Sequence, residues 1–143
     1  MIQTGANSTE SKLYALLNNA KVDLNDKSKN WITLDRTFFE TGKASLLKTS
    51  SIQVNNFKEI LNAYPNASLK IGGYTDNTGN ADLNQKLSNN RANAFYEALK
   101  ASGINSDRMK AEGYGSQHPI CKANDTDICK AQNRRIDVRL MTK

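Results

Sequence analysis

Apolar residues recur along this chain with two periods, which predict alternating helices and strands. Leucine and alanine recur at helical spacing over residues 13–20, so we expect a short amphipathic helix there. Residues 31–35 (WITLD) alternate between apolar and polar, as in a half-buried strand. Apolar residues then mark one face of a helix over residues 49–64, which must end there because Pro65 follows.

A second strand and a long helix follow. Residues 69–74 (LKIGGY) predict the strand, and residues 82–101 predict the helix, with Asp82 as its cap. Gly103 suits a left-handed conformation after the helix end. The expected apolar stripe of this helix consists of Leu83, Leu87, Ala94, Phe95, Ala98 and Leu99.

Two further strands complete the pattern. We expect them over residues 109–115 (MKAEGYG) and 134–141 (RRIDVRLM), where apolar residues alternate with charged ones in the second. The segment between them is interpreted as a loop that carries both cysteines. The predicted order is therefore β-α-β-α-β-β, an α/β (α+β) fold in the form of a two-layer sandwich.

Composition agrees with one compact domain. A chain of 143 residues with 38% apolar residues is long enough for a single core and lies above the disordered range. No apolar run is long enough to span a membrane, and the start, MIQTGANSTESK, lacks a secretory signal. The net charge of +6 reflects either a solvated, mildly basic surface or affinity for a polyanion such as nucleic acid, phospholipid or cell-wall polymer.

The two cysteines flank a polar loop, CKANDTDIC. Their spacing matches no standard zinc or redox motif, so we expect a local Cys121–Cys129 disulfide, with two unpaired cytosolic thiols as the alternative. Closing this nine-residue loop would contribute about 2.5 kcal/mol. A disulfide would place the protein in an oxidising compartment, and the chain would then be an excised part of an exported protein.

The candidate chemistry is concentrated between Gly73 and Ala92. Asp76 lies in a Gly/Asn-rich turn after a predicted strand, and Arg91 follows fifteen residues later on the predicted helix. A carboxylate and a guanidinium on one platform can bind a zwitterion, because the acid accepts an ammonium and the arginine holds a carboxylate. Alternatively, Asp76 organises its own turn and Arg91 is a surface residue.

Other chemistries have weaker support. His118 is the only histidine and has no nucleophile beside it, and GGYTDNTG is neither a dinucleotide fingerprint nor a phosphate loop. Asp76, Asp82 and Glu112 could form a carboxylate pair as in a glycosidase, but nothing in the sequence selects such a pair. The last strand carries three arginines, which we interpret as a solvated sheet face with one structural partner: Arg134, Arg135 and Arg139.

Four motifs, in order, resemble those of the OmpA-like peptidoglycan-binding domain (the OmpA/Pal/MotB C-terminal family). GGYTDNTGNADLNQKLSNNRANAF resembles the central signature, TDxxG followed by NxxLSxxRA. FFETGKASL resembles the segment after the first strand, EGYGSQHP resembles the GxGxxxP element, and AQNRRIDV resembles the closing NRRV-type strand. The resemblance covers residues 31–143, which we expect to be the domain, and leaves residues 1–30 as an N-terminal extension.

The resemblance implies a mixed sheet and non-covalent binding of the peptidoglycan stem peptide, usually through meso-diaminopimelate. It implies no enzymatic reaction, no metal, no cofactor and no nucleic-acid partner. It also implies a periplasmic protein, tethered to the outer membrane through a segment outside this chain. The alternatives are a peptidoglycan-modifying enzyme and a basic nucleic-acid-binding module.

The resemblance also assigns ligand-binding residues. Asp76 would accept the ammonium of the ligand and Arg91 would hold a carboxylate. The other residues of the implied site support or line the pocket: Thr75, Asn84, Leu87, Phe39, Thr41, Gly42 and, as a secondary support, Arg135. Many members of the family have a Gly-Arg pair where this chain has Cys129-Lys130, which favours a loop pinned by a disulfide.

Overall fold

Four strands form one mixed sheet in the computed structural model of the chain, which describes residues 8–19, 21, 23–24, 30–34, 39, 44–46, 48–117 and 126–143. The strands are β1 (Trp31–Thr33), β2 (Ser68–Tyr74), β3 (Met109–Gly113) and β4 (Arg135–Thr142). In the sheet order β1-β4-β2-β3, β4 is antiparallel to both β1 and β2, whereas β2 and β3 are parallel. The predicted α+β fold with a mixed sheet is confirmed.

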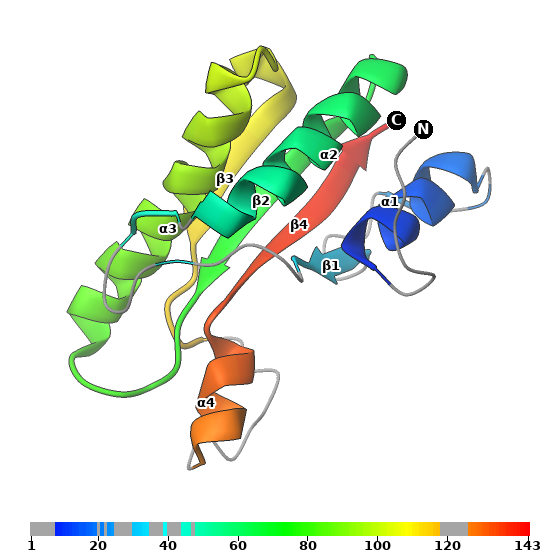
Figure 1. Ribbon diagram of the computed structural model, residues 1–143. Helices are drawn as coiled ribbons and strands as arrows, with labels where there is room; N and C mark the ends of the chain where they lie inside the picture. The colour runs from blue at the N-terminus through cyan, green and yellow to red at the C-terminus, as the bar shows by residue number, and fades with distance from the viewer. Residues whose placement is uncertain are drawn as a thin grey trace.

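The helices are arranged around this sheet as Figure 1 shows. Their bounds are α1 (Thr9–Asn18), α2 (Ser51–Ala63), α3 (Ala81–Ala101) and α4 (Asp127–Asn133), with single 3-10 turns η1 (Lys48–Ser50) and η2 (Ser106–Arg108). Helices α2 and α3 contact each other, and α3 packs along β2 and β3. Helix α1 lies beside β1, and α4 lies at the end of the sheet where β4 begins (Figure 1).

The hydrophobic core lies between the sheet and the two central helices. The rings of Phe57 on α2 and Phe95 on α3 meet edge to face, with centroids 5.5 Å apart. The strand residues that face them are fully or almost fully buried: Leu69, Ile71, Ile136, Val138 and Leu140. Alternate residues of β2 and β4 therefore point toward the helices, as the period of a strand requires.

Helix α3 differs from its prediction at its first turn. The cap is Asn80, whose Oδ1 accepts the backbone N–H groups of Asp82 and Leu83, so the assignment of Asp82 as the cap was wrong. Leu83 is 66% exposed, because Ser88 already lies over Gly73 near the end of β2 and the first turn projects past the sheet. The buried face instead consists of Ser88, Arg91, Ala92, Phe95 and Leu99.

The end of α3 follows its prediction. Gly103 has a φ of 109°, and its N–H donates to the carbonyl of Lys100. The N–H of Ile104 donates to the carbonyl of Leu99, and both of these side chains are buried. This is a Schellman motif with its usual apolar contact, and it explains why glycine occupies the position after the helix.

The N-terminal helix is attached to the domain. Leu13 and Leu17 of α1 belong to the hydrophobic core, and the Thr9 hydroxyl donates to the Thr33 carbonyl at 2.8 Å. At the other end of α1, Lys143 Nζ donates to the Leu16 carbonyl at 3.3 Å. Within the described residues, no helix combines the length and the apolar character needed to span a bilayer.

Helix α4 was not expected, because the segment around Cys129 was interpreted wholly as a loop. Thr126 caps this helix by accepting the N–H of Cys129. A helix of seven residues completes only two turns and carries almost no apolar period, so the pattern of the sequence could not identify it. Cys129 is buried, while Cys121 lies outside the described residues, so the disulfide between them stays a prediction.

Candidate functional site

Several of the predicted site residues lie at the end of the sheet where β2 ends and β4 begins. Tyr74, the last residue of β2, is the register partner of Arg135, the first residue of β4. Asp76 follows β2 by two residues, and α3 runs back across the same strand. Gly73 permits this close crossing, because a Cβ atom there would lie 2.1 Å from the backbone oxygen of Ser88.

Asp76 is held as a buried carboxylate. Its side chain is only 10% exposed; Oδ1 accepts the Thr78 N–H at 2.8 Å and Oδ2 accepts Nη1 of Arg134 at 2.5 Å. Burial alone would raise the pKa of Asp76, but the hydrogen bonds from Thr78 and Arg134 outweigh it and hold the pKa below its ordinary value. The group is therefore ionised at neutral pH and presents a fixed negative charge.

Arg91 supplies the opposite charge from the buried face of α3. The residue is 7% exposed, and its guanidinium lies 5.1 Å from the ring centroid of Phe39, within the range of a cation–π contact. Burial lowers the pKa of Arg91 and the positive charge of Arg134 lowers it further, whereas the negative charge of Asp76 raises it.

Two further predicted residues support the Asp76 loop. The side-chain amide of Asn84 donates to the Thr78 carbonyl at 2.9 Å and, at 3.4 Å, to the Asp76 carbonyl. The Thr75 hydroxyl donates to the same Asp76 carbonyl at 2.8 Å. Thr75 and Asn84 therefore fix the backbone from which the carboxylate projects.

The remaining predicted residues are less directly connected to Asp76. Leu87 is half-buried on α3, and Phe39 contributes its ring to Arg91 rather than only its backbone. Thr41 and Gly42 lie outside the described residues.

Arg134 is the charged residue that the sequence reasoning did not assign to the site. It follows α4 directly, and its side chain crosses to Asp76 from a position 58 residues later in the chain. The NRR motif holds two adjacent arginines, and in the structure Arg134 is the one that reaches Asp76.

Arg135 is bound elsewhere. Its Nε donates to Asp137 at 3.1 Å, and its guanidinium lies 3.9 Å from the ring centroid of Tyr74. Asp137 also accepts the hydroxyl of Thr33 at 2.7 Å, and the Tyr74 ring stacks on Tyr114. Arg135 thus ties β1, β2 and β4 together on the face of the sheet opposite the two central helices.

The carboxylates considered for catalysis are separated by the fold. Glu112 pairs with Lys70 at 2.9 Å on β3 and β2, and Asp82 is exposed in the first turn of α3. His118 lies outside the described residues. In the part of the chain that the structure describes, no three His, Cys, Asp or Glu side chains are grouped to hold a metal ion.

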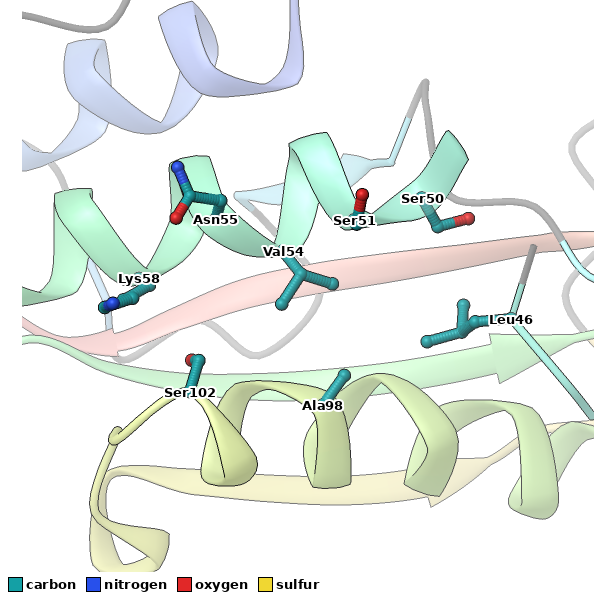
Figure 2. Close-up of a pocket in the computed structure, with 8 residues that line it drawn as sticks. All are labelled: Leu46, Ser50, Ser51, Val54, Asn55, Lys58, Ala98 and Ser102. Atoms are coloured by element: carbon teal, nitrogen blue, oxygen red, sulfur yellow. The ribbon is translucent and has the colours of Figure 1, made fainter. Parts of the chain in front are cut away.

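A separate cavity of about 250 Å³ lies between α2 and α3. Figure 2 shows Val54 on α2 and Ala98 on α3 directed toward each other across it, with Leu46 at one end. Its other lining residues are Ser50, Ser51, Asn55, Lys58 and Ser102. Apolar atoms contribute most of the surface that lines the cavity. None of the predicted ligand-binding residues lines it.

The charged cluster can therefore bind a small ligand that carries both charges. A buried carboxylate and a buried guanidinium are strong partners for an ammonium and a carboxylate, since desolvated charges interact more strongly than exposed ones.

Comparisons with known proteins agree with the motifs. The model of the OmpA family matches residues 38–134. The chain is 35% identical over 102 residues to "Probable lipoprotein YiaD" of Escherichia coli (strain K12), covering 71% of this chain and 46% of that protein. It is 32% identical over 101 residues to "Peptidoglycan-associated lipoprotein" of Agrobacterium fabrum, covering 71% of this chain and 56% of that one.

A solved structure has the same fold. The peptidoglycan-associated lipoprotein from Burkholderia pseudomallei superposes with a TM-score of 0.68 at 24% identity, covering 82% of this chain and 99% of that one. The present chain spans only about half the length of the two sequence relatives. The family model covers well over half of the chain and includes Asp76, Arg91 and Arg134. The chain therefore belongs to the OmpA family.

Proposed function

We propose that this domain binds peptidoglycan non-covalently by recognising the zwitterionic end of diaminopimelate in the stem peptide. The observation that carries the proposal is the pair of buried opposite charges, Asp76 and Arg91, at the end of the sheet where Gly73 closely approaches the α3 backbone at Ser88 and Ala92. One relative is a peptidoglycan-associated lipoprotein by name, which supports the same polymer as the partner.

In this proposal each end of the zwitterion has its own partner. Asp76 accepts the ammonium, and Arg91 holds the carboxylate through parallel hydrogen bonds. Thr75 and Asn84 hold the Asp76 loop, and the Phe39 ring orients the Arg91 guanidinium. Leu87 lines the pocket, Thr41 and Gly42 contribute backbone contacts, and Arg135 supports the strand end: these four assignments rest on the family resemblance.

The domain acts as an anchor and performs no reaction in this proposal. It holds an outer-membrane or envelope protein to the cell wall from the periplasm. The names of the relatives, which include lipoproteins and outer-membrane proteins, support an envelope location. A Cys121–Cys129 disulfide belongs to the same proposal, because the periplasm is oxidising.

Co-sedimentation with purified sacculi tests the proposal. The parent protein should pellet with sacculi, whereas Asp76→Asn and Arg91→Gln should each remain in the supernatant. Removing one partner of a buried charged pair costs about 2–5 kcal/mol, so the affinity should fall at least thirtyfold. If both variants pellet like the parent protein, the site assignment is wrong.

Matched control variants distinguish the loss of the binding site from a change in the net charge of the protein. Asp107→Asn and Lys100→Gln remove one negative and one positive charge from exposed positions, Asp107 in η2 and Lys100 in the last turn of α3. Both should pellet like the parent protein. Lys100 lies nine residues after Arg91 on α3, about 14 Å farther along the helix axis.

Two additional measurements address the alternative functions. An enzyme acting on the wall would release soluble muropeptides over time, whereas a binding domain leaves the sacculi intact. A nucleic-acid-binding domain would lose affinity steeply as salt rises. Binding of a small zwitterion in a buried site should change little between low and physiological salt, since buried charges are weakly screened.

A further inference from the structure

The Asp76 carboxylate already has a cationic partner within the protein. Nη1 of Arg134 lies 2.5 Å from Oδ2, while the Thr78 N–H occupies Oδ1. The ammonium of a bound zwitterion would need the same carboxylate. We propose that Arg134 is an internal competitor of the ligand: its guanidinium holds Asp76 in the unliganded protein and is displaced when the ammonium binds. This inference rests on the proposed function.

The exposure of the two side chains favours displacement of Arg134 rather than movement of Asp76. The Arg134 side chain is 44% exposed, whereas that of Asp76 is 10% exposed. Among the described residues, the guanidinium of Arg134 donates hydrogen bonds to Asp76 alone. It can therefore rotate into water and exchange one hydrogen-bond partner for another, whereas Asp76 is fixed by its loop.

The neighbouring arginine, Arg135, is held in place by several contacts. The Arg135 side chain is 8% exposed and is held by Asp137, the Asn133 carbonyl and the Tyr74 ring. Arg134 has no comparable set of partners within the part of the chain that the structure describes. Adjacent arginines therefore have different roles: Arg135 holds the sheet together, and Arg134 is available for exchange.

The position of the Arg134 charge determines whether its removal strengthens or weakens binding of the ligand. The zwitterionic end of diaminopimelate has no net charge. The other carboxylates of a stem peptide are attracted at a distance by Arg134 and Lys110 alike, so Lys110→Gln measures that contribution. At the site, the guanidinium is in contact with Asp76, where the ammonium of the ligand would bind, and two cations repel each other there. The ligand carboxylate would lie farther away, at Arg91. Removing the Arg134 charge should therefore strengthen binding of a zwitterion.

The test compares the parent protein with Arg134→Gln, Arg134→Lys and Lys110→Gln in calorimetric titrations. Lys110 is exposed on β3, so its variant makes the same change in net charge away from Asp76. The probe is a stem tripeptide that ends in meso-diaminopimelate, with its N-terminus acetylated. A second probe also has the side-chain amine of diaminopimelate acetylated, which removes the ammonium and leaves the carboxylates.

We expect Arg134→Gln to bind the first probe about threefold to tenfold more tightly, because the partly exposed ion pair no longer has to be broken. Arg134→Lys, which keeps a cation, and Lys110→Gln should stay near the affinity of the parent protein. With the second probe, Arg134→Gln should bring no gain. Equal or weaker binding of the first probe by Arg134→Gln would overturn the inference, since Arg134 would then be inert or would itself hold the ligand.

The outcomes also separate this inference from the proposed function. If the parent protein binds the first probe, Asp76→Asn abolishes binding and Arg134→Gln does not strengthen it, only the competition is disproved. If the parent protein binds neither the probe nor sacculi, the proposed function fails and the inference fails with it.

Discussion

Nη1 of Arg134 donates to Oδ2 of Asp76 across 2.5 Å, which joins the residue before β4 to the loop after β2. β2 and β4 are antiparallel neighbours, so the last residue of β2 and the first residue of β4 lie at the same end of the sheet. Helix α3 crosses β2 near this end, and Arg91 lies on the buried face of the helix. The sheet topology brings Arg134 to Asp76, although 58 positions separate them in the sequence.

The first prediction concerns the crossing of α3 over β2. A Cβ atom in Gly73→Ala would lie 2.1 Å from the Ser88 backbone oxygen, and a helix backbone cannot yield without moving the whole helix. We expect a loss of about 3 kcal/mol in the free energy of unfolding, measured by urea denaturation. Because α3 carries Arg91, affinity for sacculi should fall as well.

The adjacent glycine provides the control for this prediction. In Gly72→Ala the new Cβ would point to the opposite face, 3.0 Å from Cε2 of Tyr114 and 3.1 Å from the hydroxyl of Tyr74, so that only side-chain atoms would have to move. The expected loss is less than about 1 kcal/mol. Equal effects of the two substitutions would show that the close approach of α3 is not what requires glycine at position 73.

The second prediction concerns the face of α3 that is buried. Leu99 is fully buried, whereas Leu83 is exposed in the first turn. Leu99→Ala should cost about 2–5 kcal/mol in the free energy of unfolding, because it leaves a cavity in the core. Leu83→Ala should change it by less than about 0.5 kcal/mol. A large loss in Leu83→Ala would mean that the first turn packs against the domain.

Sequence periodicity located α3 but not its exact face, and the reason is geometric. The predicted stripe included Leu83 because it lies at helical spacing from Leu87, yet nothing in the sequence says where the strand beneath the helix ends. The buried face also includes two polar residues, Ser88 and Arg91. Hydrophobicity alone cannot assign such residues to the interior.

The sequence predicted the spatial proximity of residues that share one local motif better than contacts between distant segments. Asp76 and Arg91 are fifteen residues apart in one signature, and the structure brings both to the same end of the sheet. Arg134 depends on α4, a seven-residue helix without a clear apolar period. The contact between Arg134 and Asp76 joins residues 58 positions apart, and no local pattern predicts it.

The third prediction concerns the cysteines. If Cys121 and Cys129 form a disulfide, the unfolded protein should show no free thiol before reduction and two after it, as measured with a thiol reagent. Reduction should lower the free energy of unfolding by about 2.5 kcal/mol, because the nine-residue loop is no longer closed in the unfolded chain. Two free thiols in protein prepared under oxidising conditions would contradict the pairing.

The fourth prediction concerns the pH dependence of the Asp76 contacts. The pKa of Asp76 is lowered in the folded protein, since the hydrogen bonds from Thr78 and Arg134 outweigh the effect of burial. A carboxyl group with a depressed folded pKa stabilises the fold above its unfolded pKa, which is about 3.9. That stabilisation is lost as the pH falls through the folded pKa.

Urea denaturation at several pH values measures this effect. At pH 7, Asp76→Asn should be less stable than the parent protein by about 1–3 kcal/mol, the value of a hydrogen bond to a charged group. The difference should persist at pH 5 and shrink below about pH 4 as Asp76 becomes protonated. Arg134→Gln, which keeps the carboxylate but removes its cationic partner, should shift this loss to higher pH. A stability difference independent of pH between 7 and 2 would show that the Asp76 carboxylate contributes through packing and not through its charge.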